Sequence, residues 1–297
     1  MPLVTLKDLT ADALRGRYAV GMFNTLNLEM VRGVLGAAEE LRSPVIIAVA
    51  EVHTPYSPLS DIGPVLVRAA ERARVPVAVH LDHGVTMETI RAALDIGFSS
   101  VMYDGSTLDF ETNIANTREV VALAGACGAS VEAELGHVGG GEAGTEDEGT
   151  PASSAEEAFY TDVEQAADFV ARTGCDALAV AIGTVHGVYR TRPRLDLQRL
   201  EDIRRRAQLP IVLHGGSGLS DGDFHDCIQR GVAKINICTD MFIHIMESVK
   251  TIAKTGSYQY TEVISATDKA VKETVMEKLR LFGSTGKAPA DSGRSLV

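Results

Sequence analysis

Three histidines stand directly after short apolar segments that are widely separated along the chain. They are His83 in HLDHG, His186 in IGTVHG and His214 in VLHGGSG. Two acids occupy similar positions, Asp104 in SVMYDG and Glu134 in SVEAELG. Imidazole nitrogens and carboxylate oxygens are ligands of zinc and related divalent ions. Three protein ligands with an open fourth position are typical of catalytic zinc, so the histidines predict a catalytic metal site.

The acids near these histidines have more than one interpretation. Asp104 and Glu134 would either bind a second cation or orient the histidines from an outer shell, and the sequence leaves both roles open. Asp82 directly precedes His83, where a carboxylate beside the metal can transfer a proton to or from a substrate hydroxyl. The alternative for Asp82 is a carboxylate that only supports the site.

Ligands so far apart in sequence need a fold that gathers the ends of many strands at one rim. Apolar runs alternate with helix-length segments such as 30–41 and 89–97. The predicted strands span residues 18–24, 44–50, 76–82, 99–104, 129–135, 176–182, 210–215 and 232–237. This alternation predicts an α/β fold, a single (β/α)8 TIM barrel domain over residues 1–297. Active sites of such barrels lie at the C-terminal ends of the strands.

Two stretches depart from this repeat. Residues 136–161 are rich in Gly, Ser and acids and are too long for an ordinary connection. We interpret them as a mobile lid or an assembly surface. After the last strand, residues 245–254 and 266–283 predict extra C-terminal helices.

Two loops predict a phosphate site beside the metal. HGGSGLSD (214–221) brings glycine backbone and the Ser217 hydroxyl close to a ligand. KINICTD (234–240) leads into a helix, whose free N-terminal amides favour an anion. These loops follow the seventh and eighth strands, where barrels frequently bind phosphate.

Composition and charge narrow the class of function. The chain is 45% hydrophobic and 5% aromatic, with no Trp, which suits the buried aliphatic strands of a parallel sheet. A net charge of -12 disfavours binding to nucleic acid or to an anionic membrane. We find no apolar run of about 20 residues and no secretion signal, so we expect no membrane span. The four cysteines form no CxxC, which predicts reduced thiols and a cytoplasmic location.

The motifs LDHG, YDGS, EAELG, IGTVHG, HGGSG and KINICTD, in this order, resemble the class II (metal-dependent) ketose-bisphosphate aldolases of the fructose- and tagatose-bisphosphate type. With LRLFGSTGKA near the end, the resemblance runs from Phe23 to Lys287. It implies reversible aldol cleavage of a sugar phosphate, a ketose phosphate, to dihydroxyacetone phosphate and an aldehyde. It further implies a catalytic Zn2+, a second divalent metal and a monovalent cation, Na+ or K+, near the phosphate. We also expect a homodimer or a homotetramer.

The same resemblance assigns roles to individual residues. Zinc would be bound by His83, His186 and His214, and a second metal by Asp104 and Glu134. Asp82 would be the proton donor. Glu142 matches the acid that protonates the ene-diolate, with Glu146 and Glu148 as alternatives. Dihydroxyacetone phosphate would contact Asn24, Gly187, Gly215, Gly216, Ser217, Asn236, Ile237, Cys238 and Thr239.

Departures from the family pattern concern the far end of the substrate. After the second strand, AVAEVHTPYSP carries Glu51 and His53 where bisphosphate-cleaving relatives have a small turn. Relatives of the fructose-bisphosphate branch carry an Asp and an Arg before the C-terminal helix, and that Arg reaches the distal phosphate. The stretch 257–265 has neither residue. Arg190, Arg192 and Arg194 either substitute for that Arg or are solvated loop charges. We therefore expect fructose 1,6-bisphosphate to be a poorer substrate than a ketose 1-phosphate with another far end.

Two alternatives from other classes stay open. A Schiff-base aldolase needs a buried lysine, and Lys234 is the candidate. A non-catalytic partner subunit of a tagatose-bisphosphate aldolase should have lost ligands, whereas this chain retains the full set. Borohydride trapping would reveal the Schiff base, and EDTA would abolish a metal-dependent activity.

Overall fold

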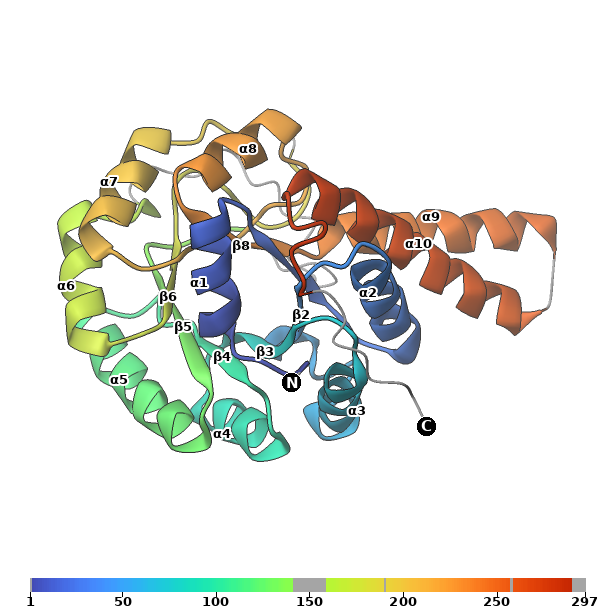
Figure 1. Cartoon of the computed structure of the whole chain (residues 1–297), viewed down its shortest axis with the longest axis horizontal. Helices are drawn as coiled ribbons and strands as arrows, with labels where there is room; N and C mark the ends of the chain where they lie inside the picture. Colours follow the sequence, from blue (N-terminus) through green and yellow to red (C-terminus); the bar gives the residue numbers. More distant parts are fainter. Residues whose placement is uncertain (1, 141–158, 190, 257–258, 290–297) are drawn as a thin grey trace.

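In the computed structural model, parallel strands close into a barrel that is surrounded by helices (Figure 1). The structure describes residues 2–140, 159–189, 191–256 and 259–289. The strands pair in chain order from the first to the eighth, and the eighth pairs with the first. The fold is therefore a (β/α)8 TIM barrel, as the sequence predicted.

The observed strands match the predicted ones to within a few residues at each end. They are β1 (Val20–Asn24), β2 (Val45–Ala50), β3 (Val77–Gly84), β4 (Ser100–Tyr103), β5 (Ser130–Leu135), β6 (Ala177–Val180), β7 (Ile211–Leu213) and β8 (Val232–Ile237). Both faces of these strands are buried, because helices cover the outside and side chains fill the inside. The aliphatic composition of the strands follows from this double burial.

Most of the described helices connect successive strands around the outside, but the first precedes β1 and the last two follow β8. The helices are α1 (Leu6–Gly16), α2 (Leu28–Glu40), α3 (Leu59–Arg72), α4 (Met87–Ile96), α5 (Phe110–Cys127), α6 (Val163–Thr173), α7 (Leu197–Ala207), α8 (Asp221–Gln229), α9 (Thr239–Thr255) and α10 (Tyr260–Leu281), with a 3-10 turn η1 (Glu51–His53). Several begin at a polar side chain that accepts a hydrogen bond from the first turn, for example Asn27, Asp162 and Ser220. These caps fix where the connecting loops end.

The two ends of the barrel differ. Helix α1, which the sequence analysis did not predict, lies across the N-terminal end and closes it (Figure 1). Its Leu6, Leu9 and Ala13 pack with Met22 and Ile46 from the strand interiors. The loops that follow the strands are therefore left at the opposite end, where the predicted site residues lie.

The C-terminal helices form a hairpin that projects from the barrel (Figure 1). The sequence predicted helices at 245–254 and 266–283, but both begin earlier, at Thr239 and Tyr260. Helix α9 starts directly after β8, and α10 packs against α2.

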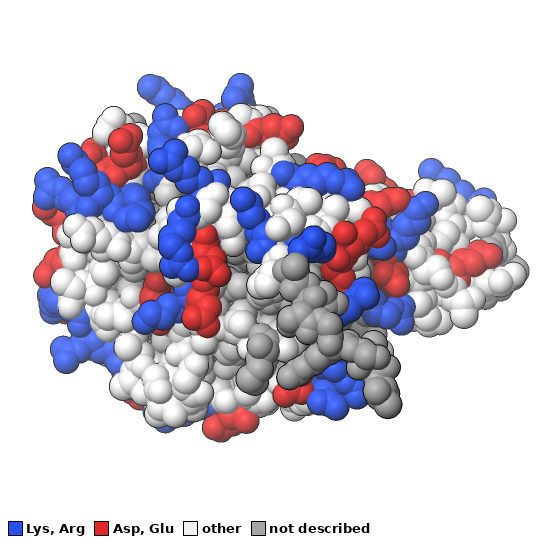
Figure 2. All heavy atoms as spheres, viewed as in Figure 1, with Lys and Arg blue, Asp and Glu red and all other residues white. Residues whose placement is uncertain are grey.

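Basic and acidic side chains are interspersed over the face in Figure 2, although the net charge is -12. Within the described residues, no helix is long and apolar enough to cross a membrane.

Candidate active site

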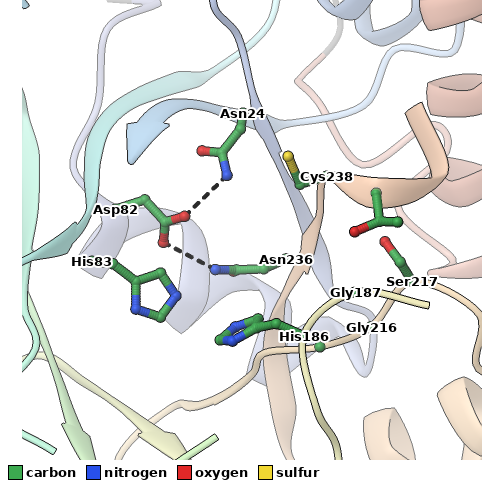
Figure 3. A pocket seen from close by; sticks show the side chains of 11 residues that line it. Asn24, Asp82, His83, His186, Gly187, Gly216, Ser217, Asn236 and Cys238 are labelled. Carbon is green, nitrogen blue, oxygen red and sulfur yellow. Dashed lines mark hydrogen bonds between the residues drawn. The ribbon is translucent and has the colours of Figure 1, made fainter. Parts of the chain in front are cut away.

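Asp82 and His83 are neighbours in β3, and both line one pocket at the C-terminal end of the barrel (Figure 3). Consecutive side chains of a regular strand point to opposite faces. His83 instead has a φ of 43°, in the left-handed region, and the pairing of β3 with β4 shifts register between Leu81 and Gly84. This irregular backbone explains how both side chains reach the pocket. Such strain is characteristic of functional sites.

The three predicted histidines converge. The ring centroids lie 5.0 Å apart for His83 and His186, 4.6 Å for His83 and His214, and 5.8 Å for His186 and His214. One nitrogen of each lies within 4.8 Å of the others. His214 directly follows β7, whereas His186 lies in the loop beyond β6 rather than at the strand end. Its amide donates to the carbonyl of Gly139, 2.8 Å away, which holds that loop in place.

The hydrogen bonds of two of these rings show that the residues fit a metal. Nδ1 of His83 lies 2.8 Å from Asp104, and Nε2 of His214 lies 2.9 Å from Glu132. An ionised carboxylate only accepts hydrogen bonds, so each of these nitrogens carries the proton. The opposite nitrogens, Nε2 of His83 and Nδ1 of His214, then direct lone pairs at each other across 2.9 Å. A cation between converging lone pairs removes this repulsion, which suits a metal site.

The protonation of His214 agrees with a ligand role. Burial lowers the pKa of His214 well below its usual value, and the charge of Lys234 lowers it further. His214 is fully buried. It is therefore neutral near pH 7, which is the form of imidazole that binds a metal.

Asp104 and Glu134 lie on the other side of His83. Oxygens of both lie within 4.8 Å of a nitrogen of His83, so this group could also hold an ion. Burial would raise the pKa of Asp104, but hydrogen bonds from His83 and Ser106 lower it. Burial and the charge of Asp104 raise the pKa of Glu134 well above its usual value. Asp104 thus contacts the ring of His83, as an outer-shell residue would. The group of His83, Asp104 and Glu134 could also hold a second cation.

The carboxylate of Asp82 is held between two amides (Figure 3). Nδ2 of Asn24, from β1, donates to one oxygen over 3.1 Å, and Nδ2 of Asn236, from β8, donates to the other over 3.1 Å. Within the described residues, the Oδ1 atoms of both asparagines are buried without a hydrogen-bond partner. A bound molecule that carries hydroxyl groups would satisfy these acceptors.

The predicted phosphate loops line the same pocket. Gly215 has a φ of 63°, and a side chain there would meet the carbonyl of Val185. Ser217 Oγ accepts a hydrogen bond from the amide of Asp240 over 3.3 Å, at the start of α9. The N-cap of α9 is Cys238, whose side chain makes no capping bond. A helix N-terminus that opens on a glycine-rich loop is suited to bind an anion.

The pocket contains most of the residues predicted to bind substrate. Its lining is Asn24, Asp82, His83, His186, Gly187, Gly215, Gly216, Ser217, Asn236, Cys238 and Thr239. The side chain of Ile237 is instead buried in the layer between barrel and helices, so that residue offers only its backbone. Glu142, Glu146 and Glu148 lie outside the described residues.

Glu51 and His53, which were expected near the far end of the substrate, make contacts with other parts of the chain. The carboxylate of Glu51 accepts hydrogen bonds from the Val85 and Thr86 amides and from the Thr86 and Thr89 hydroxyls, at 2.7 to 3.1 Å. It therefore caps the start of α4. His53 is buried, with its ring 5.9 Å from that of Phe242. The Glu51 carboxylate, which from the sequence we expect to repel a second phosphate, is thus engaged by donors at the start of α4.

Of the three arginines suggested as a substitute clamp, Arg192 and Arg194 are exposed. Arg192 lies 3.4 Å from Asp223 and is largely exposed beside the start of α8. Arg190 lies outside the described residues. The described contacts of Arg192 therefore favour its interpretation as a surface charge.

Two residues that shape the site, Tyr189 and Glu132, were not predicted from the sequence. The Tyr189 hydroxyl donates to the carbonyl of Gly215 over 2.7 Å and accepts from the amide of Val185 over 3.1 Å. It thus ties the loop that carries His186 to the phosphate loop. Glu132 contacts His214, and it stands two residues before Glu134 in VEAEL, so the alternation of acids along β5 was a readable signal.

Lys234, the lysine of the Schiff-base alternative, forms a buried ion pair. Lys234 is fully buried, and its Nζ lies 2.8 Å from Oε2 of Glu132. It does not line the pocket described above. A Schiff base needs a neutral amine that faces the substrate, so this ion pair disfavours that mechanism.

The chain is similar to known proteins over nearly its whole length. A family profile described as "Fructose-bisphosphate aldolase class-II" matches residues 4–287. The fructose-bisphosphate aldolase of Geobacillus stearothermophilus is 42% identical over 293 residues, which cover 97% of this chain and 99% of that enzyme. The YdjI protein of Escherichia coli K12 is 43% identical over 277 residues, which cover 93% of this chain and 96% of that protein.

Solved structures show the same similarity. The crystal structure of the YdjI aldolase from Escherichia coli K12 has a TM-score of 0.85 at 40% identity and covers 97% of this chain and all of that chain (100%). A putative fructose-1,6-bisphosphate aldolase from Coccidioides immitis has a TM-score of 0.86 at 33% identity, with 95% and 97% of the two chains covered.

Proposed function

The chain belongs to the class-II fructose-bisphosphate aldolase family and is therefore a carbon–carbon lyase, and we propose that it cleaves a ketose phosphate reversibly to dihydroxyacetone phosphate and an aldehyde. The observation that carries this proposal is the convergence of His83, His186 and His214 beside a phosphate-type loop and a buried carboxylate. A metal, an anion site and a proton acceptor within one pocket are the parts that an aldol cleavage requires.

His83, His186 and His214 would hold the catalytic metal, which we propose to be Zn2+. The metal would supply a Lewis acid that stabilises the negative charge developing on the C2 oxygen of the substrate. Asp104 and Glu134 would hold a second divalent ion, and a monovalent cation, Na+ or K+, would lie near the phosphate. The chain's own contribution is to fix the imidazoles and to exclude water from the buried side of the site.

Asp82 would handle the proton of the C4 hydroxyl. In cleavage it accepts that proton while the C3–C4 bond breaks. C4 becomes the carbonyl carbon of the aldehyde, and the electron pair of the broken bond passes toward C2. In condensation the proton returns. The Asn24 and Asn236 amides hold both carboxylate oxygens, which fixes Asp82 for this transfer.

Dihydroxyacetone phosphate would bind at the loops after β6, β7 and β8. Ser217 and the amides at the start of α9 would bind the phosphate, with Gly187, Gly215 and Gly216 allowing close approach. The free Oδ1 atoms of Asn24 and Asn236 would accept substrate hydroxyls.

A loop acid would protonate C3 after cleavage, and we assign this step to Glu142. In Glu142→Ala, solvent exchange of the dihydroxyacetone phosphate proton should slow more than substrate binding weakens. Glu146→Ala and Glu148→Ala are the matched controls. Normal exchange in Glu142→Ala together with its loss in Glu146→Ala would move the role to Glu146.

The far end of the substrate is the second part of the proposal. The stretch 257–265 lacks an Arg, and Arg192 is paired with Asp223. These observations favour a ketose 1-phosphate whose far end is neutral or carries a different charge. Fructose 1,6-bisphosphate should accordingly be the poorer substrate.

The experiment that tests the function combines metal analysis with an assay for dihydroxyacetone phosphate over a panel of ketose phosphates. Bound Zn2+ and activity that EDTA abolishes are expected. A kcat/KM for fructose 1,6-bisphosphate above ~10^6 M⁻¹s⁻¹, ahead of every monophosphate, would contradict the assignment of the far end. A cytoplasmic location and a homodimer or homotetramer stay predictions, which fractionation and sedimentation would test.

A further inference from the structure

A buried polar cluster lies inside the barrel beneath the pocket. Glu132 on β5 and Lys234 on β8 are both fully buried, and β5 and β8 are not neighbours in the barrel. Nζ of Lys234 lies 2.8 Å from one carboxylate oxygen of Glu132 and 3.1 Å from the other. The pair therefore spans the interior of the barrel between the apolar plug of α1 and the histidines.

This ion pair is not explained by stability. Removing two charges from water costs more than their attraction usually returns, and apolar residues of the same volume often stabilise a core equally well. The same Glu132 carboxylate also lies 2.9 Å from Nε2 of His214. The cluster thus makes a specific contact with a candidate metal ligand.

The contact settles which nitrogen of His214 faces the pocket. Glu132, ionised beside Lys234, accepts hydrogen bonds and donates none, so Nε2 of His214 carries the proton. Nδ2 of Asn236 also lies 3.2 Å from that nitrogen and 3.1 Å from Asp82. The contact of the nitrogen with the Glu132 carboxylate is shorter, at 2.9 Å, and a hydrogen bond to an ionised acceptor is the stronger one. Nδ1 of His214 then keeps its lone pair and points toward His83, 2.9 Å away.

We propose that Glu132 and Lys234 together form a positioning unit for the metal site. Glu132 holds His214 with Nδ1 directed at the metal, and Lys234 balances the buried negative charge of Glu132. The proposal rests on the metal site of the proposed function. It assigns to Lys234 a role in metal binding rather than in covalent catalysis.

A matched pair of double variants tests the proposal through Zn2+ affinity, measured by competition with a chelator. Glu132→Gln with Lys234→Met keeps an oxygen that accepts from His214 and leaves no charge unpaired. Glu132→Leu with Lys234→Met removes the acceptor and also leaves no charge unpaired. Glu39→Gln, in the surface pair with Arg74, is the control that removes an ion pair far from the site.

The Leu–Met variant should bind Zn2+ ~10–100-fold more weakly than the wild type, as expected when an outer-shell partner of a ligand is lost. The Gln–Met variant and the Glu39→Gln control should stay close to the wild type. Equal affinities of the two double variants, whether weakened or not, would overturn the proposal. Absence of Zn2+ binding in the wild type would instead contradict the proposed function, so the two failures are distinguishable.

A second measurement needs no variant and holds even if the double variants do not fold. Nitrogen-15 NMR of the imidazoles in the Zn2+-loaded wild type reports the protonated nitrogen of each ring. His214 should be protonated at Nε2 and metal-bound at Nδ1. The reverse arrangement would contradict the role of Glu132.

Discussion

The pocket uses its polar groups differently from the loop that follows β2. In the pocket, nitrogens of His83 and His214 converge, and among the described residues the buried Oδ1 atoms of Asn24 and Asn236 have no hydrogen-bond partner. In the loop after β2, Glu51 accepts four hydrogen bonds at the start of α4 and does not line the pocket. Contacts with neighbouring residues therefore decide whether a polar residue that follows a strand serves the site.

The largest effect should follow from loss of a candidate metal ligand in the pocket. His186→Ala removes one of the three nitrogens that converge, so metal content and activity should fall together. The loss of activity should exceed the ~10^2–10^4-fold range typical of a lost acid–base group. Metal analysis and turnover assays check this, with His225→Ala on exposed α8 as the control. Full turnover of metal-free His186→Ala would break the contrast between the pocket and the loop after β2.

Asp82→Ala should cause the next largest effect. Loss of the group that transfers the C4 hydroxyl proton should lower kcat ~10^2–10^4-fold while Zn2+ stays bound. Steady-state kinetics and metal content, measured on the same sample, check this. If metal content declined in step with activity, Asp82 would act as a ligand or a support, which was the alternative left open by the sequence.

Tyr189→Phe should have a moderate effect on stability. The substitution leaves the buried amide of Val185 without its acceptor, which costs ~1–3 kcal/mol of the free energy of unfolding. The loop that carries His186 should also loosen relative to Gly215. Urea denaturation measures the cost, and an unchanged free energy of unfolding would show that water replaces the hydroxyl.

The smallest effect on catalysis should come from the loop after β2, outside the pocket lining. Glu51→Gln should cost ~0.5–2 kcal/mol of stability, because it weakens the cap of α4. The preference between fructose 1,6-bisphosphate and a ketose 1-phosphate should not change. Glu88→Gln, an exposed acid in the first turn of α4, is the matched control. A shift toward the bisphosphate in Glu51→Gln alone would restore the repulsion expected from the sequence.

Local pattern sufficed to predict the fold and many residues of the pocket. The alternation of apolar strands and helices is set by nearby residues, and a closed parallel barrel brings the ends of all its strands to one rim. His83, His214, Asp82 and the loop of Gly215 were therefore found from sequence. Helix α1 was missed because its role, to plug the barrel, depends on contacts with strands throughout the chain.

The sequence by itself determined which residue types stand at the strand ends, and hence the class of chemistry. Tertiary structure decided how those residues are used. The φ of 43° at His83 turns two consecutive side chains into one pocket, and Glu51 faces α4. The pairing of Glu132 with Lys234 joins residues 102 positions apart on strands that are not adjacent. Such contacts depend on the closed barrel and on the backbone at single positions, and neither is encoded in local spacing.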